Sequence, residues 1–223
     1  MKILIIGNQN QVKEFELKFE GHEITVVDIA TVDDEDIESH DVVFDFLLDE
    51  APDNLELYQE IEGLPVFVNA PKISLAEQTY ISGGVRCLLF GFNGLPTFLN
   101  REILEVSLLD RNTLTKLEEV CHELGTEHIV VDDRVGMATP RVICMIINEA
   151  FYTVQEGTAS KKDIDLGMKL GTNYPYGPFE WCDLIGVNHV YELLEAVYED
   201  TKDERYKICP MLKKAYLTNS DND

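Results

Sequence analysis

The sequence predicts an α/β protein with a mostly parallel sheet, followed by an all-helical C-terminal domain. Two observations support this class. Apolar, strand-like runs alternate with helical segments as far as residue 132, which is typical of βαβ units that form a parallel sheet. From residue 133 onward the apolar residues recur at helical spacing instead. We therefore expect two domains, residues 1–132 and residues 133–223.

The N-terminal segment has the order strand, helix, strand. Lys2–Gly7 is a continuous apolar run that ends in glycine, as a buried parallel strand would. Glu23–Asp28 is a second strand that ends in an acid. This order is typical of a Rossmann-type unit, in which the turn after the first strand binds a pyrophosphate and the acid binds ribose hydroxyls. We therefore expect a truncated Rossmann-like domain, with Gly7 and Asp28 as its candidate cofactor-binding residues.

The turn after Gly7 departs from the dinucleotide fingerprint, which has three glycines in the pattern Gly-x-Gly-x-x-Gly. Residues 7–12 read Gly-Asn-Gln-Asn-Gln-Val, so one glycine remains. Polar side chains take up space that the phosphates need. Two interpretations stay open: a nucleotide site of the usual kind, or a turn kept only for packing, and the second is favoured.

The remaining segments continue these two patterns. In the first domain we expect an acidic loop from Asp28 to Asp41, strands over 41–48, 64–69, 85–90, 103–106 and 128–132, and helices over 55–61, 75–80 and 112–124. In the second domain we expect helices over 141–154, 164–170, 178–185 and 189–199, and a frayed polar tail over 218–223.

The chain is strongly acidic, with a formal net charge of −24. Residues 1–132 hold 8 basic and 27 acidic side chains, and the stretch 31–60 holds 12 acids and no Lys or Arg. Such a field disfavours nucleic acid and anionic membrane surfaces as partners. We interpret the acidic stretch 31–60 as a solvated surface that aids solubility.

Cysteine usage and hydropathy bear on the location. The 5 cysteines are scattered and contain no Cys-x-x-Cys pair, which argues against a disulfide framework and a thiolate zinc site. The apolar run after Lys2 is too short for a signal peptide, and no run approaches the roughly 18 residues of a membrane span. We expect no metal site and a cytoplasmic location.

Several stretches of the second domain occur in register in a known family. They are Ile147-Asn-Glu-Ala150, Asp163-Ile-Asp165, Tyr176-Gly-Pro-Phe-Glu180, Asp183-Leu-Ile-Gly186 and Pro210-Met-Leu-Lys213. In these residues the chain resembles the 3-hydroxyacyl-CoA dehydrogenases, while residues 1–132 resemble them more loosely. The resemblance implies NAD as the cofactor, an acyl-CoA ligand, a homodimer formed through the helical domain, and oxidation of the 3-hydroxyl group.

The resemblance also places the catalytic positions of the family. Its histidine general base falls on Asn93, and the glutamate that orients this base falls on Glu105. Its serine falls on Lys72, with Ser74 two residues away, and its asparagine falls on Pro140. An amide cannot accept a proton near neutral pH. With three of the four positions substituted, we expect the activity to be severely impaired or lost, as in a pseudoenzyme.

Other interpretations of these residues stay open. The chain would alternatively be a non-catalytic dimeric acyl-CoA-binding or scaffold protein, or an enzyme of altered chemistry that uses Lys72 or Glu105. The simplest role for Glu105 is a hydrogen bond from Asn93 or an ion pair with Lys72. We interpret the 5 histidines as surface or capping residues rather than as a relocated base.

Overall fold

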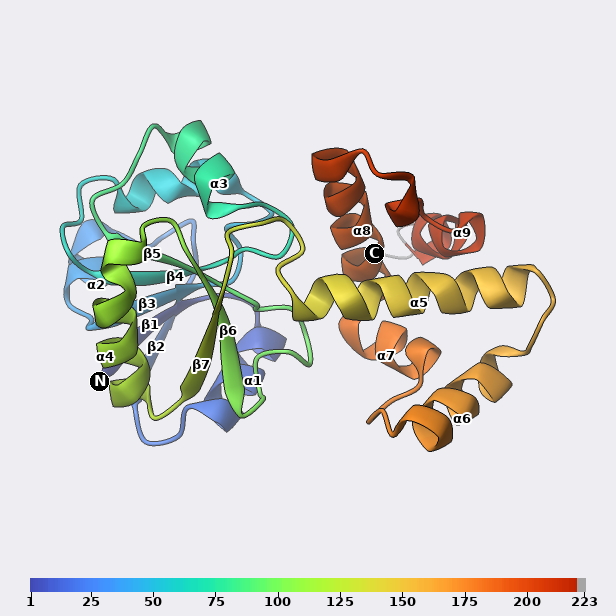
Figure 1. Cartoon of the computed structure of the whole chain (residues 1–223). Coiled ribbons are helices and arrows are strands. Elements are labelled where there is room, and N and C mark those ends of the chain that lie inside the picture. The colour runs from blue at the N-terminus through green and yellow to red at the C-terminus, as the bar shows by residue number, and fades with distance from the viewer. Residues whose placement is uncertain (220–223) are drawn as a thin grey trace. The chain divides into compact units, whose positions relative to one another are not determined.

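The structure is a computed structural model that describes residues 1–219, apart from the side chain of Asp34. The chain divides into two compact units, Met1–Met137 and Ala138–Asp223 (Figure 1). Residues 133–137, which we expected in the helical domain, lie in the first unit. Of the predicted tail, Thr218 and Asn219 are helical, and the rest lies outside the described residues.

A mostly parallel sheet forms the first unit. Over the described residues its strand order is β2-β1-β3-β4-β5-β6-β7. Neighbouring strands are parallel except β5 and β6. The strands are β1 (Lys2–Ile6), β2 (Glu23–Val27), β3 (Val42–Asp45), β4 (Pro65–Asn69), β5 (Leu88–Phe92), β6 (Ile103–Leu108) and β7 (Glu127–Val131). The predicted α/β class with a Rossmann-like sheet is confirmed.

Helices cover both faces of this sheet (Figure 1). On one face, Phe15 and Leu117 belong to a core with β1, β3 and β4 through β6. On the other face, Ile37, Leu55 and Leu75 pack on β1 and β3 through β5. The helical elements are α1 (Gln9–Lys18), α2 (Asp34–Glu38), the 3₁₀ helix η1 (Pro52–Tyr58), α3 (Leu75–Ser82), the 3₁₀ helix η2 (Arg111–Thr113) and α4 (Leu114–Leu124).

Some predicted boundaries are wrong. The expected acidic loop contains α2, because Asp33 caps it by accepting from the Asp36 N–H at 2.9 Å and Ile37 is buried. The strand predicted over 41–48 ends at Asp45, whose carboxylate accepts from the Leu47 N–H at 2.9 Å and turns the chain. The segments predicted as strand 85–90 and helix 55–61 lie at 88–92 and 52–58.

The second unit is helical, as predicted. Its elements are α5 (Thr139–Gln155), α6 (Lys161–Thr172), α7 (Pro178–Ile185), α8 (Val187–Thr201), the 3₁₀ helix η3 (Glu204–Tyr206) and α9 (Pro210–Asn219). We did not predict α9, although Pro210 at its first position is a typical start signal. Asn148 of α5 fixes the approach to α9, because its side chain donates to Lys207 O at 3.0 Å and accepts from Cys209 N at 2.8 Å.

The start of α7 requires a glycine. Asp165 Oδ1 accepts from the Phe179 N–H at 2.8 Å. A Cβ on Gly177 would lie 2.3 Å from the Asp165 side chain, so a larger residue would displace this cap. Glu180 Oε2 accepts from the Gly177 N–H at 3.1 Å and Glu180 Oε1 pairs with Lys169 Nζ at 2.6 Å. The stretch that carries the family resemblance is therefore a tightly bonded corner.

Among residues 1–219, no helix is both long enough and apolar enough to cross a membrane. The predicted cytoplasmic location stays a prediction.

Candidate functional site

The carboxyl ends of the parallel strands bring most of the candidate residues of the first unit to one edge of the sheet, where ligands bind in open α/β sheets. Gly7 follows β1 and Asp28 follows β2. Lys72 lies in the segment after β4, and Asn93 directly follows β5. Pro140 belongs instead to the helical unit, in the first turn of α5, where it offers no side-chain hydrogen-bonding group.

Asn93 and Glu105 fall at opposing positions of the antiparallel pair β5 and β6. Phe92 pairs with Val106, and continuing this register by one residue places Asn93 opposite Glu105. Both side chains are buried, with exposed fractions of 3% and 6%. Asn93 Oδ1 accepts from the Leu95 N–H at 3.3 Å. The amide at the histidine position therefore supports a turn of the backbone.

Lys72 lies against two acids that follow β3. Its Nζ is 3.3 Å from Glu50 Oε1 and 3.9 Å from Asp49 Oδ2. The Lys72 and Asp49 side chains are 9% and 1% exposed. Burial raises the pKa of Asp49 to about 7, and nearby Lys72 and Asn69 oppose this rise only in part. The residue at the serine position therefore belongs to a mostly buried charge cluster.

Sequence reasoning missed a buried polar group beside this cluster. Asp45 is fully buried and accepts from the Tyr58 hydroxyl at 3.0 Å. Burial raises the pKa of Asp45 to about 6. The Asn69 side chain accepts from Gly94 N at 2.9 Å and donates to Phe46 O at 3.4 Å. The sequence does contain a signal for these contacts, because Asp45 and Asn69 are an acid and an amide at the ends of apolar strands.

Gly7 and Asp28 line one small pocket, of about 300 Å³, with residues that include Asn8, Val27 and Leu47. Its walls are the ends of β1 and β2, as expected for the ribose side of a dinucleotide site. Asp28 is exposed, and its Oδ1 accepts from the Ala30 N–H at 2.9 Å. One oxygen of the Asp28 carboxylate therefore already accepts a hydrogen bond within its own turn.

The phosphate-binding turn is occupied by its own side chains. Asn8 Oδ1 accepts from the N–H groups of Asn10 at 3.0 Å and Gln11 at 3.1 Å. Gln11 Oε1 accepts in return from the Asn8 N–H at 2.8 Å. These are the backbone donors with which a helix start binds a phosphate. The residues present do not fit the NAD pyrophosphate that the family resemblance implies.

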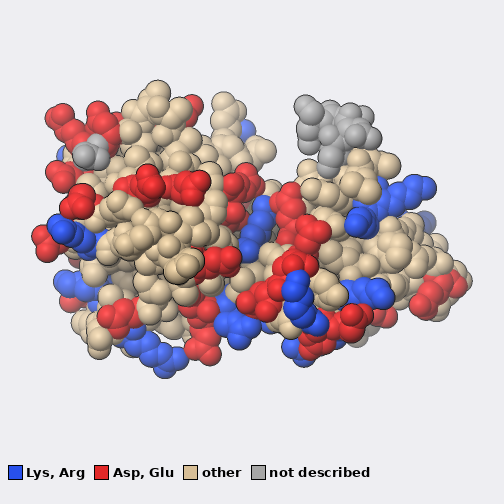
Figure 2. Space-filling view, turned by 90° about the horizontal axis from the view of Figure 1, so that it is seen from above, with Lys and Arg blue, Asp and Glu red and all other residues tan. Residues whose placement is uncertain are grey.

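Acidic side chains are spread over the surface of the first unit, with fewer basic ones between them (Figure 2). The charge count agrees, since residues 1–132 hold 27 acidic and 8 basic side chains. Most of these acids are exposed, as a solvated surface requires, but Asp45 of the stretch 31–60 is fully buried. This field offers no attraction for a phosphate-bearing ligand.

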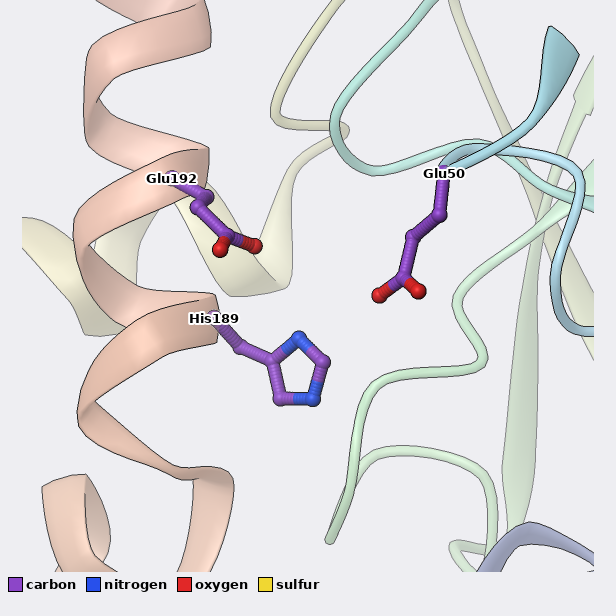
Figure 3. A group of neighbouring side chains, drawn as sticks. All are labelled: Glu50, His189 and Glu192. Carbon is purple, nitrogen blue, oxygen red and sulfur yellow. The ribbon is translucent and has the colours of Figure 1, made fainter. Parts of the chain in front are cut away.

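The helical unit carries one histidine, His189, in the first turn of α8. His189 and Glu192, one helical turn apart, project from the same side of α8 (Figure 3). Figure 3 also labels Glu50, which comes from the turn after β3 in the first unit. His189 is half-buried, and its interpretation as a surface or capping residue stays a prediction.

Comparison with solved structures supports the assignment of the fold. The fold is similar to the crystal structure of (S)-3-hydroxybutyryl-CoA dehydrogenase from Ralstonia eutropha, with a TM-score of 0.74 and 20% sequence identity. The match covers 98% of this chain and 94% of that chain. The fold is therefore that of the dehydrogenases that join a Rossmann-like domain to a helical one.

Sequence comparison relates part of the chain to one family. Residues 136–220 match the family model of the 3-hydroxyacyl-CoA dehydrogenase C-terminal domain. The 3-hydroxyadipyl-CoA dehydrogenase of Escherichia coli (strain K12) is 41% identical over 96 residues, covering 43% of this chain and 20% of the relative. The probable 3-hydroxybutyryl-CoA dehydrogenase of Bacillus subtilis (strain 168) is 32% identical over 122 residues, covering 55% and 42%. Residues 136–220 are thus similar to the C-terminal domain of the 3-hydroxyacyl-CoA dehydrogenase family, and the matched part of the chain spans less than half the length of these two relatives.

Proposed function

We propose that the chain is a member of this family in which NAD-dependent oxidation of 3-hydroxyacyl-CoA is severely impaired or lost. Buried Asn93 carries the proposal. It stands where the resemblance places the general base, and its carboxamide oxygen accepts from Leu95 N. A carboxamide takes up no proton near neutral pH, and general acid–base catalysis typically contributes roughly 10²–10⁴-fold.

The other substituted positions support the same proposal. Lys72 stands where a hydroxyl would position the substrate oxygen, and its ammonium lies against Glu50 and Asp49. Pro140 stands where an amide would donate, and proline has no side-chain donor. Only Glu105 keeps the family's residue type. A carboxylate without its imidazole partner has no base to orient.

The experiment is NADH-linked reduction of acetoacetyl-CoA by the purified chain, with the Bacillus subtilis relative as positive control under the same conditions. We expect a turnover at least about 100-fold below that of the relative, from the missing base alone. Turnover within tenfold of the relative would overturn the proposal.

A second candidate function is a non-catalytic dimeric protein that binds acyl-CoA or acts as a scaffold. The helical unit supports it, because no residue of α6 is fully buried within the chain. Leu166 and Leu170 are 50% and 79% exposed, and a Cβ on Gly167 or Gly171 would meet no atom within 4 Å. Such an apolar helix face is expected to be covered by a partner, for which we propose a second copy of the chain.

Calorimetric titration with acetoacetyl-CoA in the absence of NADH separates the two candidates. Saturable binding without turnover would support an acyl-CoA-binding dimer. Absence of binding would remove the acyl-CoA ligand from this candidate and leave the scaffold. We propose the cytoplasm as the location of either form.

A further inference from the structure

We infer that this chain has lost the binding of dinucleotides, because the side chains of Asn8 and Gln11 close the turn that would hold the pyrophosphate. This inference goes beyond the proposed loss of turnover, since it concerns an equilibrium of binding and does not involve Asn93. It rests on three observations: the hydrogen bonds of the turn, the occupied space above Gly7, and the hydrogen bonds that Glu14 of helix α1 accepts from another loop.

The donors of the turn are already engaged. At an open helix start, the first N–H groups have no partner within the helix, and a bound anion satisfies them. In α1 the N–H groups of Asn10 and Gln11 donate to Asn8 Oδ1 at 3.0 and 3.1 Å. The Asn8 N–H donates to Gln11 Oε1 at 2.8 Å, which completes a capping box. The carboxamides therefore take the place of the anion.

The space above Gly7 is also taken. A Cβ on Gly7 would lie 3.1 Å from Gln11 Oε1 and 3.2 Å from the Phe46 ring. In the dinucleotide fingerprint this region is kept clear by glycines so that the backbone can approach the pyrophosphate. A phosphate oxygen placed here would face two carboxamide oxygens, which are acceptors and offer it no hydrogen. Binding would require both side chains to leave and the cap to be given up.

One turn further along, helix α1 also bonds to another segment of the first unit through Glu14. The Glu14 carboxylate accepts from three backbone N–H groups of the segment between β5 and β6: Thr97 and Asn100 at 3.1 Å and Leu99 at 3.2 Å. The helix is thus bonded at its start by its own side chains and along its length to another loop. The side-chain oxygens of Asn8, Gln11 and Glu14 therefore serve internal contacts.

The test is calorimetric titration of the full chain with NADH and, separately, with ADP, which carries the pyrophosphate without the nicotinamide. We expect no saturable binding of NADH or ADP at ligand concentrations up to about 1 mM. The variant Asn8→Gly/Gln11→Ala frees the donors and clears the space, while glycine remains an acceptable helix cap. We expect this variant to bind ADP and NADH at least tenfold more tightly than the unaltered chain.

Gln9→Ala is the matched control, because Gln9 lies in the same turn and its side chain is exposed. We expect the control to bind no more NADH than the unaltered chain, and circular dichroism confirms that each variant is folded. Saturable binding by the unaltered chain below about 100 µM would overturn the inference. A folded double variant with no gain would also overturn it, because Asn8 and Gln11 would not be what closes the turn. Since the readout is binding, the result is independent of whether the chain turns over substrate.

Discussion

Asp45 and Asp49 are carboxyl groups that the fold buries around the turn after β3. Asp45 accepts hydrogen bonds from Tyr58 and Leu47, and Asp49 faces Lys72 and Asn69, with Glu50 and Asp45 close by. Burial raises the pKa of Asp45 to about 6 and that of Asp49 to about 7, from 3.8. The folded chain therefore holds protons that the unfolded chain has already released between pH 4 and 7.

This linkage predicts that the free energy of unfolding falls as the pH rises. The contribution is fully present below the unfolded pKa near 4 and is lost as the pH passes the folded values near 6 and 7. One pKa unit corresponds to about 1.36 kcal/mol, so the total effect is on the order of a few kcal/mol. Urea unfolding at several pH values between 4 and 8 measures it.

The variant Asp49→Asn removes one of the two titrating groups and keeps the shape of the side chain. We expect its free energy of unfolding to depend less on pH than that of the unaltered chain. The matched control is Asp53→Asn, at an exposed acid of η1, which should leave the dependence unchanged. If Asp49→Asn kept the full slope, the assignment of the effect to this carboxyl would be wrong.

At the scale of elements, α1 holds the loop between β5 and β6 through one carboxylate. Glu14 accepts from the N–H groups of Thr97, Leu99 and Asn100, and Thr97 has a positive φ of 75°, which a non-glycine residue adopts only when its surroundings impose it. The carboxylate supplies this constraint. The loop lies between Asn93 and Glu105, so α1 is bonded to the connection between the two candidate residues.

Replacement of Glu14 by glutamine should loosen this loop. The NH2 group that replaces one carboxylate oxygen is a donor and cannot accept from the backbone N–H groups, and a buried donor left unpaired costs about 1–3 kcal/mol. Hydrogen exchange of Thr97, Leu99 and Asn100 should become faster, whereas β4 should keep its protection. Glu16→Gln, at an exposed position of the same helix, is the control. Equal exchange rates in both variants would contradict the role of Glu14.

At the scale of the whole molecule, the two units differ in what they retain. The helical unit contains the corner of Gly177 and Asp165 and matches the family model of the 3-hydroxyacyl-CoA dehydrogenase C-terminal domain over residues 136–220. In the sheet unit, the side chains of Asn8, Gln11 and Lys72 make internal contacts at positions where the resemblance predicts ligand-binding or catalytic residues. A protein with an intact helical unit and a closed cofactor turn is expected to act by association.

The exposed face of α6 makes this expectation testable. Leu166→Glu/Leu170→Glu places two charges on the proposed contact between copies, where unpaired charges oppose burial. Light scattering should give twice the mass of the chain for the unaltered protein and the mass of one chain for the variant. Leu217→Glu, at an exposed leucine of α9, should stay dimeric. A monomeric unaltered chain, or an unaffected double variant, would exclude this contact.

Sequence patterns predicted an element well where its apolar residues recurred over a long stretch. They predicted an element poorly where hydrogen bonds of polar side chains determined the backbone conformation. The long apolar stretch within α5 was sufficient to locate that helix. In contrast, α2 was missed because four of its five residues are acidic and only Ile37 anchors it in the core. The early end of β3 was missed because Asp45 accepts a hydrogen bond within the turn that follows it. The spacing of apolar residues does not reveal such a bond.

The sequence by itself determined the α/β class, the helical second part and the family resemblance, because these depend on local periodicity and on residues in register along the chain. It also showed an amide, Asn93, where the resemblance places the base, and a carboxamide takes up no proton near neutral pH. Only the tertiary structure decided what the substituted residues do instead. Asn8 and Gln11 close their own turn, and Lys72 lies against Asp49 and Glu50. These contacts depend on distances and burial between segments, which spacing along the chain does not specify.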